Sequence, residues 1–237
     1  MSLYGVIAGV QGNREALSAV LGALEKRGVR RIVCLGDVVG CNADPDECVE
    51  MVRRRCAAVI AGTHDLIALG RLGWESCSTW AEYSLRRTRR ALSAASRSYL
   101  AELPPSAVLD DGIVLAHLGA DPAALRARFP GVRVCFAGDG PQQNEQRIDE
   151  LYVLSPGSVD ASRNRGRLAE CALFDTLERS AEFLRVPYDS AATEAKAAVF
   201  GYRINPLADR LYTLRRRTAS AARLIGARLH RAGQSGR

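Results

Sequence analysis

The sequence predicts an α/β protein, with a parallel β-sheet in the first third of the chain and a second sheet in its strand-rich second half. Two observations carry this prediction. Short apolar runs alternate with helix-periodic segments over the first 61 residues, and such a βαβαβ order forms a parallel sheet with helices on its faces. After about residue 105, short apolar runs follow one another with little helical periodicity between them.

The first third contains three expected strands and two expected helices. The expected strands are the apolar runs at 6–10, 31–36 and 57–61. After the first run, apolar residues recur at helical spacing from Ala16 to Leu24, and Gly28 ends that helix. After the second run, Asp44 and Pro45 open another helix, because proline is favoured at the first helical position.

The rest of the chain begins with helical periodicity over 76–103, and short apolar runs then replace this periodicity. A β-hairpin is expected at 108–115, with Gly112 in its turn. Further strands are expected at 133–137, 151–154, 169–175 and 182–186, and a short helix at 191–200.

The composition is that of an ordinary globular protein. Of the 237 residues, 47% are hydrophobic and 25% charged, which argues against a disordered chain or a small disulfide-stapled one. No apolar run approaches the ~20 residues of a membrane span, and no secretory signal is evident, so we expect a cytoplasmic protein. The seven cysteines form no CxxC pair and are expected to be free thiols.

The positive charge is concentrated at the end of the chain. The segment 202–237 holds nine arginines and one acid, whereas the formal net charge of the whole chain is +7. This predicts a folded body over 1–201 and a basic helical extension over 202–237. The helical stripe in 206–231 leaves three interpretations open: packing on the chain's own domain or on a twin subunit, an anionic partner such as nucleic acid or an acidic protein, and a membrane surface.

Glycines, aspartates and histidines gather where the predicted strands end. The segments are 9–13 (GVQGN), 36–40 (GDVVG), 62–65 (GTHD), 116–119 (AHLG) and 138–141 (GDGP). In open α/β sheets, ligands bind beyond the carboxyl ends of the strands. One such segment is ordinarily a turn, but five in sequence predict a shared pocket.

These segments resemble, in order and spacing, the motifs of the calcineurin-like metallophosphoesterases, in particular their small prokaryotic phosphodiesterase and diadenosine tetraphosphatase-like branch. That family reads DxHGN, GDxxG followed by PDP, GNHD, HG(S/T), GHTH and NPGS. The chain also has ADP at 43–45 and SPGS at 155–158. The resemblance implies a four-layer αββα sandwich of two mixed sheets, formed by a metallophosphoesterase-like domain over 1–201.

The resemblance also implies two divalent metal ions, and one of the two sites is depleted here. Its ligand positions hold Gly9, Gln11, Asp37 and Pro141. Glycine and proline have no ligating side chain, and glutamine offers only a neutral amide oxygen. We therefore expect no dinuclear centre.

The second implied site is altered but chemically adequate. Its positions hold Asp37, Thr63, His117 and Asp139, a set that suits one Mn, Fe, Zn or Mg ion. The alternative is a metal-free pocket in which Asp37 and Asp139 remain without a metal to bind. His64 matches the family histidine that assists the leaving group, and the resemblance implies that Asp65 orients it.

Two functions therefore stay open. The first is a pseudoenzyme that lacks the dinuclear site and acts by binding a phosphate-containing ligand, such as a nucleotide, or a partner. The second is a mononuclear phosphoesterase that uses Asp37, His117, Asp139 and His64. The residues expected to line the phosphate pocket are Gly12, Asn13, Gly36, Gly62, Gly119 and Ser158.

Overall fold

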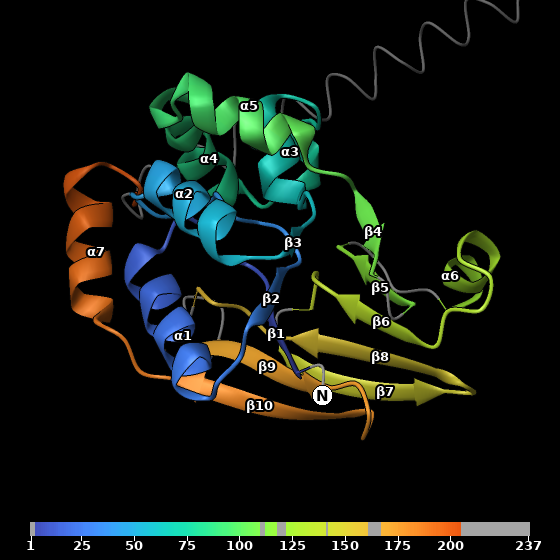
Figure 1. Cartoon of the computed structure of the whole chain (residues 1–237). Coiled ribbons are helices and arrows are strands. Elements are labelled where there is room, and N and C mark those ends of the chain that lie inside the picture. Colours follow the sequence, from blue (N-terminus) through green and yellow to red (C-terminus); the bar gives the residue numbers. More distant parts are fainter. Residues whose placement is uncertain (1–2, 110–111, 118–121, 141, 161–166, 205–237) are drawn as a thin grey trace, which may run out of the picture.

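A computed structural model describes residues 3–109, 112–117, 122–140, 142–160 and 167–204 of the chain (Figure 1). The predicted basic extension, apart from its first three residues, lies outside these ranges, as do Gly119 and Pro141. The interpretations of 206–231 therefore stay predictions. Within the described ranges, no helix combines the length and the apolar character that a membrane crossing needs.

The first sheet holds five strands in the order β10-β9-β1-β2-β3. Its strands are β1 (Leu3–Ile7), β2 (Arg31–Cys34), β3 (Ala58–Val59), β9 (Ala169–Asp175) and β10 (Ser180–Val186). The expected parallel unit β1-β2-β3 is confirmed. The assignment of the last two strands to the second sheet is wrong, since β9 returns antiparallel to β1 and β10 follows it. β9 lies beside β1 with both of its faces covered, so nearly all residues of β9 are buried.

The second sheet also holds five strands, in the order β4-β5-β6-β8-β7. They are β4 (Ser106–Val108), β5 (Ile113–Ala116), β6 (Val134–Ala137), β7 (Gln143–Ile148) and β8 (Leu151–Pro156). The predicted β4–β5 hairpin is confirmed. The strand β7 was not predicted, because the sequence QNEQRI has no apolar alternation; it is a largely exposed edge strand.

The helices cover the sandwich unevenly (Figure 1). On the outer face of the first sheet, α1 (Arg14–Lys26) packs against β9 and β10, and α2 (Pro45–Arg55) and α7 (Ser190–Val199) lie beside it. Above the strand ends lie α3 (Thr63–Leu69), the 3-10 turn η1 (Trp74–Ser76), α4 (Thr79–Ala91) and α5 (Ala94–Glu102). On the second sheet lies α6 (Pro122–Arg128).

The predicted helical stretch 76–103 is two helices in the structure. The chain leaves the helical conformation at Leu92, and Ser93 caps α5 by accepting a hydrogen bond from the backbone of Ser96. The seven-residue helices α3 and α6 were not predicted. Helices that short span only two turns, so their sequences do not show a full apolar stripe.

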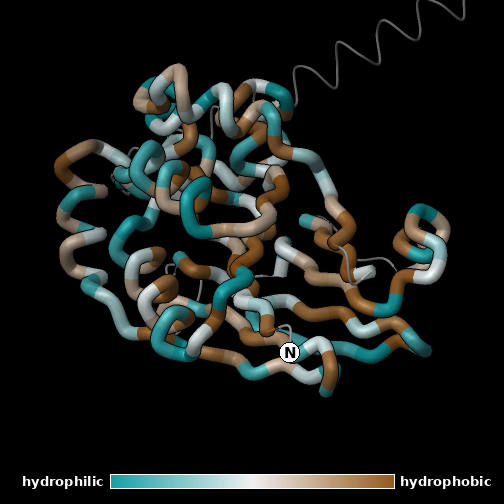
Figure 2. Tube along the Cα trace, viewed as in Figure 1, coloured by the Kyte–Doolittle hydropathy of each residue, from teal (hydrophilic) through white to brown (hydrophobic). Residues whose placement is uncertain are grey.

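Three hydrophobic layers hold the sandwich together, and Figure 2 shows the apolar residues running along the inner strands. Strand alternation creates these layers: Val6 and Val33 point between the two sheets, whereas Ile7 and Cys34 point towards the helices on the first sheet. A third, smaller layer packs Leu125 of α6 onto the second sheet. The implied αββα sandwich of two mixed sheets is thereby confirmed.

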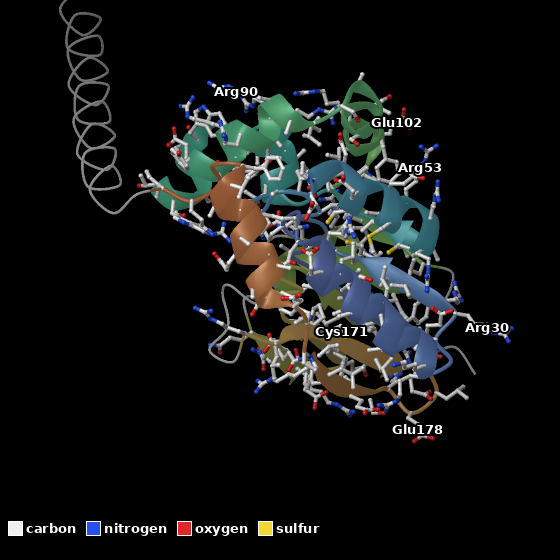
Figure 3. The ribbon with its side chains drawn as sticks, turned by 90° about the vertical axis from the view of Figure 1, so that its left-hand side faces the viewer. Arg30, Arg53, Arg90, Glu102, Cys171 and Glu178 are labelled. Atoms are coloured by element: carbon white, nitrogen blue, oxygen red, sulfur yellow. The ribbon has the colours of Figure 1, made fainter. Side chains whose placement is uncertain are left out.

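All seven cysteines are free thiols, as predicted. Cys171 lies inside, between α1 and the first sheet, while Arg30, Arg53 and Arg90 point outwards (Figure 3). Burial raises the pKa of Cys171 to about 12, so this thiol is a core residue and not a nucleophile.

Candidate functional site

The loops that follow β1 and β2 are joined backbone to backbone. The Gly9 N–H donates to the Gly36 carbonyl (3.1 Å), and the Gln11 N–H donates to the Asp37 carbonyl (2.8 Å). Gln11 and Asp37 have φ values of 58° and 54°, a left-handed conformation that is unfavourable for residues with a side chain. Two strained residues face each other at the place where the sequence predicts a site.

The side-chain amide of Gln11 connects two other candidate residues. Its Nε2 donates to Asp37 Oδ2 (2.9 Å), and its Oε1 lies 2.6 Å from His64 Nδ1. Since an amide oxygen only accepts, His64 must carry a proton on Nδ1. The three side chains are buried, and the amide stands at a position where the family resemblance implies a metal ligand.

The environment of Gly9 excludes a side chain. Gly9 has φ +62°, and a Cβ there would stand 2.5 Å from Ser158 Oγ. That hydroxyl is fixed, because it donates to the Gly9 carbonyl (3.0 Å). The packing of the Gly9 backbone against Ser158 therefore requires that position 9 has no ligating side chain.

Asp37 and His117 form the second half of the site. Asp37 Oδ1 accepts from the His64 backbone N–H (2.8 Å) and lies 3.4 Å from His117 Nε2. His117 Nδ1 donates to the Leu35 carbonyl (2.6 Å). Its Nε2 is directed at the carboxylate and has no hydrogen-bond partner among the residues that the structure describes.

A second buried polar atom, the hydroxyl oxygen of Thr63, also lacks a hydrogen-bond partner in the described structure. An unsatisfied buried hydroxyl costs about 1–3 kcal/mol. A valine at this first position of α3 would therefore give a more stable protein, because it lacks the hydroxyl.

The predicted metal ligands are not assembled as a set. Within the described residues, no three His, Cys, Asp or Glu side chains lie where they could hold a metal ion together. Asp139 lies beside His117 along one cavity, and Thr63 lies beside His117 along another. Among the described residues, Asp37 and His117 are the pair of expected ligands whose side chains approach each other, at 3.4 Å.

Asp65 does not orient His64, contrary to the expectation. It is the third residue of α3, and its carboxylate turns back to accept the Gly62 N–H (2.9 Å) and the Val39 N–H (3.0 Å). Burial and the nearby Asp37 carboxylate raise the pKa of Asp65 above its usual range. Gln11 has taken over the contact with His64.

Asn13, expected in the phosphate pocket, is used by the fold instead. Its Oδ1 caps α1 through the Ala16 N–H (3.0 Å) and accepts from Thr193 Oγ1 (3.1 Å). Its Nδ2 donates to Asp160 Oδ1 (2.9 Å). No polar atom of this side chain remains for a ligand.

The glycines expected in the phosphate pocket allow close backbone packing. A Cβ on Gly62 would stand 2.1 Å from the Asp37 nitrogen, and one on Gly36 would stand 2.4 Å from the Gly62 nitrogen. Gly12 lies against the Asn42 carbonyl. These glycines bring the loops of the site together.

Two cavities adjoin His117. One, of about 260 Å³, lies between α3, the end of β5 and α6, and its wall includes Thr63, Leu125, Arg128 and Phe129. The other, of about 290 Å³, lies over β6, β7 and β8 and includes Asp139. No sequence pattern indicated Arg128 and Phe129, because the helix that carries Arg128 and precedes Phe129 was not predicted.

No family model matches the chain. An uncharacterized protein of Methanocaldococcus jannaschii is 27% identical over 217 aligned positions, which cover 79% of this chain and 88% of that protein.

Two solved structures are similar over most of the chain. A metallophosphoesterase from Sphaerobacter thermophilus has a TM-score of 0.69 and 27% identity, covering 84% of this chain and 94% of that one. A hypothetical protein from Pyrococcus horikoshii has a TM-score of 0.73 and 21% identity, covering 86% of this chain and 95% of that one.

Proposed function

We propose that this chain, which has the fold of the calcineurin-like metallophosphoesterases, is a degenerate homologue that binds a phosphate-containing small molecule without the dinuclear metal chemistry of that fold. The observation that carries the proposal is the Gln11 amide, which is hydrogen-bonded to both Asp37 and His64. Because the Gln11 amide is used in hydrogen bonds within the protein, the residues around it offer no strong set of ligands for a second metal.

The expected consequence is a large loss of catalytic power. Two metal ions in such sites activate a water molecule and stabilise the charge on the transferring phosphoryl group. Removing electrostatic stabilisation of this kind costs several kcal/mol, and each ~1.4 kcal/mol lowers the rate tenfold. Gly9 supports the same conclusion, because its packing against Ser158 leaves no room for a carboxylate.

Binding a phosphate group requires less than hydrolysing it. Among the described residues, the hydroxyl of Thr63 and Nε2 of His117 are both buried and have no hydrogen-bond partner. The two residues lie along the same cavity, where the Thr63 hydroxyl can donate to a ligand. An anionic oxygen in this cavity satisfies that hydroxyl.

The test combines metal content, turnover and binding on the untagged full chain. We expect no stoichiometric metal by mass spectrometry, no turnover of bis(p-nitrophenyl) phosphate with Mn²⁺, and binding of inorganic phosphate that falls at least tenfold in His117→Ala. Glu150→Ala, which removes an exposed carboxylate from a turn, is the matched control. Two bound metal equivalents with efficient turnover would contradict the proposal.

The second candidate function is a mononuclear phosphoesterase, favoured by the 3.4 Å approach of His117 Nε2 to Asp37 Oδ1. In this case Asp37 and His117 would hold one ion, which would supply Lewis-acid chemistry. His64 would assist the leaving group, and Asp139 would be a further ligand of the ion. One metal equivalent is then expected. It should be lost in His117→Ala and in Asp139→Ala, retained in Glu150→Ala, and accompanied by measurable turnover.

A further inference from the structure

We infer that the ligand carries a flat apolar body beside its phosphate group, and that this body occupies the cavity between α3, β5 and α6. The inference rests on the proposed function for the phosphate end of the ligand. It adds the chemical class: an aryl phosphate or a molecule with a comparable ring, as opposed to inorganic phosphate or a sugar phosphate.

The wall of the cavity is largely apolar. Leu66 of α3, Pro105, and Leu125 and Ala124 of α6 contribute to it, and Phe129 adds an aromatic side chain. Water in such a cavity finds few hydrogen-bond partners, so its displacement by an apolar group is favourable. A sugar, whose hydroxyls each need a partner, would be poorly accommodated.

The size of the cavity suits a ring. Its volume is about 260 Å³, whereas one water molecule occupies about 30 Å³ in the liquid. The space is therefore much larger than a bound ion with a single water requires. It lies slightly below the range of about 300–1,000 Å³ that drug-sized ligands occupy, and it is too small for a folded protein segment.

The polar groups of the cavity match an anionic end. Thr63 and His117 lie on its wall, and the Thr63 hydroxyl and His117 Nε2 have no hydrogen-bond partner within the described part of the chain; Arg128 brings a permanent positive charge. The Arg128 guanidinium lies 5.3 Å from the centroid of the Phe129 ring, a cation–π distance that holds the charge beside the aromatic wall. Charge and apolar surface therefore meet in one cavity.

The outer wall is anchored rather than loose. Arg126 of α6 donates to the Ile148 carbonyl (2.8 Å) and to Asp149 (3.0 Å), which attaches the helix to the β7–β8 turn. Leu125 packs against the second sheet. A wall fixed in this way keeps the cavity formed before the ligand arrives, which lowers the cost of binding.

The experiment compares phenyl phosphate, inorganic phosphate and phenol by calorimetric titration of the untagged full chain, with phenol release monitored. We expect phenyl phosphate to bind at least tenfold more tightly than inorganic phosphate. Ala124→Trp, which fills the cavity, should abolish this advantage. Ala123→Trp, on the same helix but outside the wall of the cavity, should retain the advantage.

A second variant guards against misfolding of Ala124→Trp. Phe129→Ala removes the aromatic wall without adding bulk, and it should weaken phenyl phosphate and phenol about tenfold. Arg128→Gln should weaken phenyl phosphate but not phenol, since only the former is charged.

The outcomes separate the two proposals. Equal affinity for phenyl phosphate and inorganic phosphate, or unchanged phenyl phosphate binding in both Ala124→Trp and Phe129→Ala, would overturn the apolar subsite. If inorganic phosphate does not bind but phenol binds and is lost in Ala124→Trp, the subsite stands and the proposed phosphate function fails.

Discussion

Gln11 donates a hydrogen bond from its amide nitrogen to Asp37 across 2.9 Å, and both residues adopt the left-handed backbone conformation to face each other. The amide oxygen of Gln11 simultaneously accepts from His64. A neutral side chain thus joins the acid of one strand-end loop to the histidine of another. This network connects three buried side chains of the site, and we expect it to stabilise the fold.

Removing the amide should therefore destabilise the protein. In Gln11→Ala, the buried Asp37 Oδ2 and His64 Nδ1–H lose the Gln11 amide as a hydrogen-bond partner, and the loss of a buried hydrogen bond costs about 1–3 kcal/mol. We expect the free energy of unfolding in urea to fall by about 3 kcal/mol. Gln142→Ala, at an exposed position, should change it by less than ~0.5 kcal/mol. Equal small effects would show that the network contributes nothing.

The fit of Gly40 against the amide can be measured by a double-mutant cycle. A Cβ at Gly40 would stand 1.8 Å from Gln11 Oε1, so Gly40→Ala should cost about 2 kcal/mol through overpacking. In the Gln11→Ala background the same change should cost less than ~1 kcal/mol, since the clashing amide is gone. Gly22→Ala, in α1 with open space around it, should stabilise by about 0.5 kcal/mol. Strict additivity at positions 11 and 40 would contradict the packing.

Two threonines should respond oppositely to the same substitution. Thr63→Val removes a buried hydroxyl that has no hydrogen-bond partner among the described residues, so the free energy of unfolding should stay the same or rise by up to ~1 kcal/mol. Its binding of inorganic phosphate should weaken at the same time. Thr193→Val removes a hydroxyl that donates to Asn13 (3.1 Å), and it should cost about 1–2 kcal/mol. A loss of stability in Thr63→Val would mean that its hydroxyl is satisfied.

The contacts of Lys196 should make the attachment of α7 to α1 dependent on pH. It contacts Glu15 of α1 (2.8 Å) and also Asp44. Burial acts to raise the pKa of Glu15, but the hydrogen bond and charge of Lys196 outweigh it and lower that pKa below its usual 4.5. A lowered carboxyl pKa stabilises the fold above the unfolded pKa, and this stability disappears as the pH falls through the folded one.

Lys196→Met should therefore lower the free energy of unfolding by about 1–2 kcal/mol at neutral pH. The difference from the wild type should shrink as the pH falls below about 4, because protonated Glu15 no longer attracts a cation. Lys26→Met, an exposed residue at the end of α1, is the control. A difference that does not depend on pH in this range would exclude the electrostatic explanation. Urea unfolding at several pH values measures it.

Strong local patterns made much of the fold predictable. The α1 stripe from Ala16 to Leu24 and the Pro45 start of α2 gave helices at the expected places. The boundary within 76–103 was missed because Ser93 interrupts a polar, arginine-rich stretch whose periodicity continues on both sides. The strand β7 was missed because its hydrogen bonds to β8, and not its side chains, define it.

The candidate site was predicted as a list of positions more accurately than as a set of contacts. The sequence placed Gln11, Asp37, His64 and His117 at strand ends, and the structure brings them together. It did not indicate that His64 pairs with Gln11 and not with Asp65. That choice depends on the third residue of α3 turning back to its own N-terminus, which requires knowing that α3 exists.

The sequence by itself determined that positions 9 and 11 hold a glycine and an amide, which cannot supply an acid and an imidazole, whatever the fold. Only the tertiary structure decided which residues these two positions contact. Hydrogen bonds between Gln11, Asp37 and His64, and the cavity that α6 closes beside Thr63 and His117, join residues far apart in the chain. Contacts of this kind are set by how the two sheets pack, and no local pattern records them.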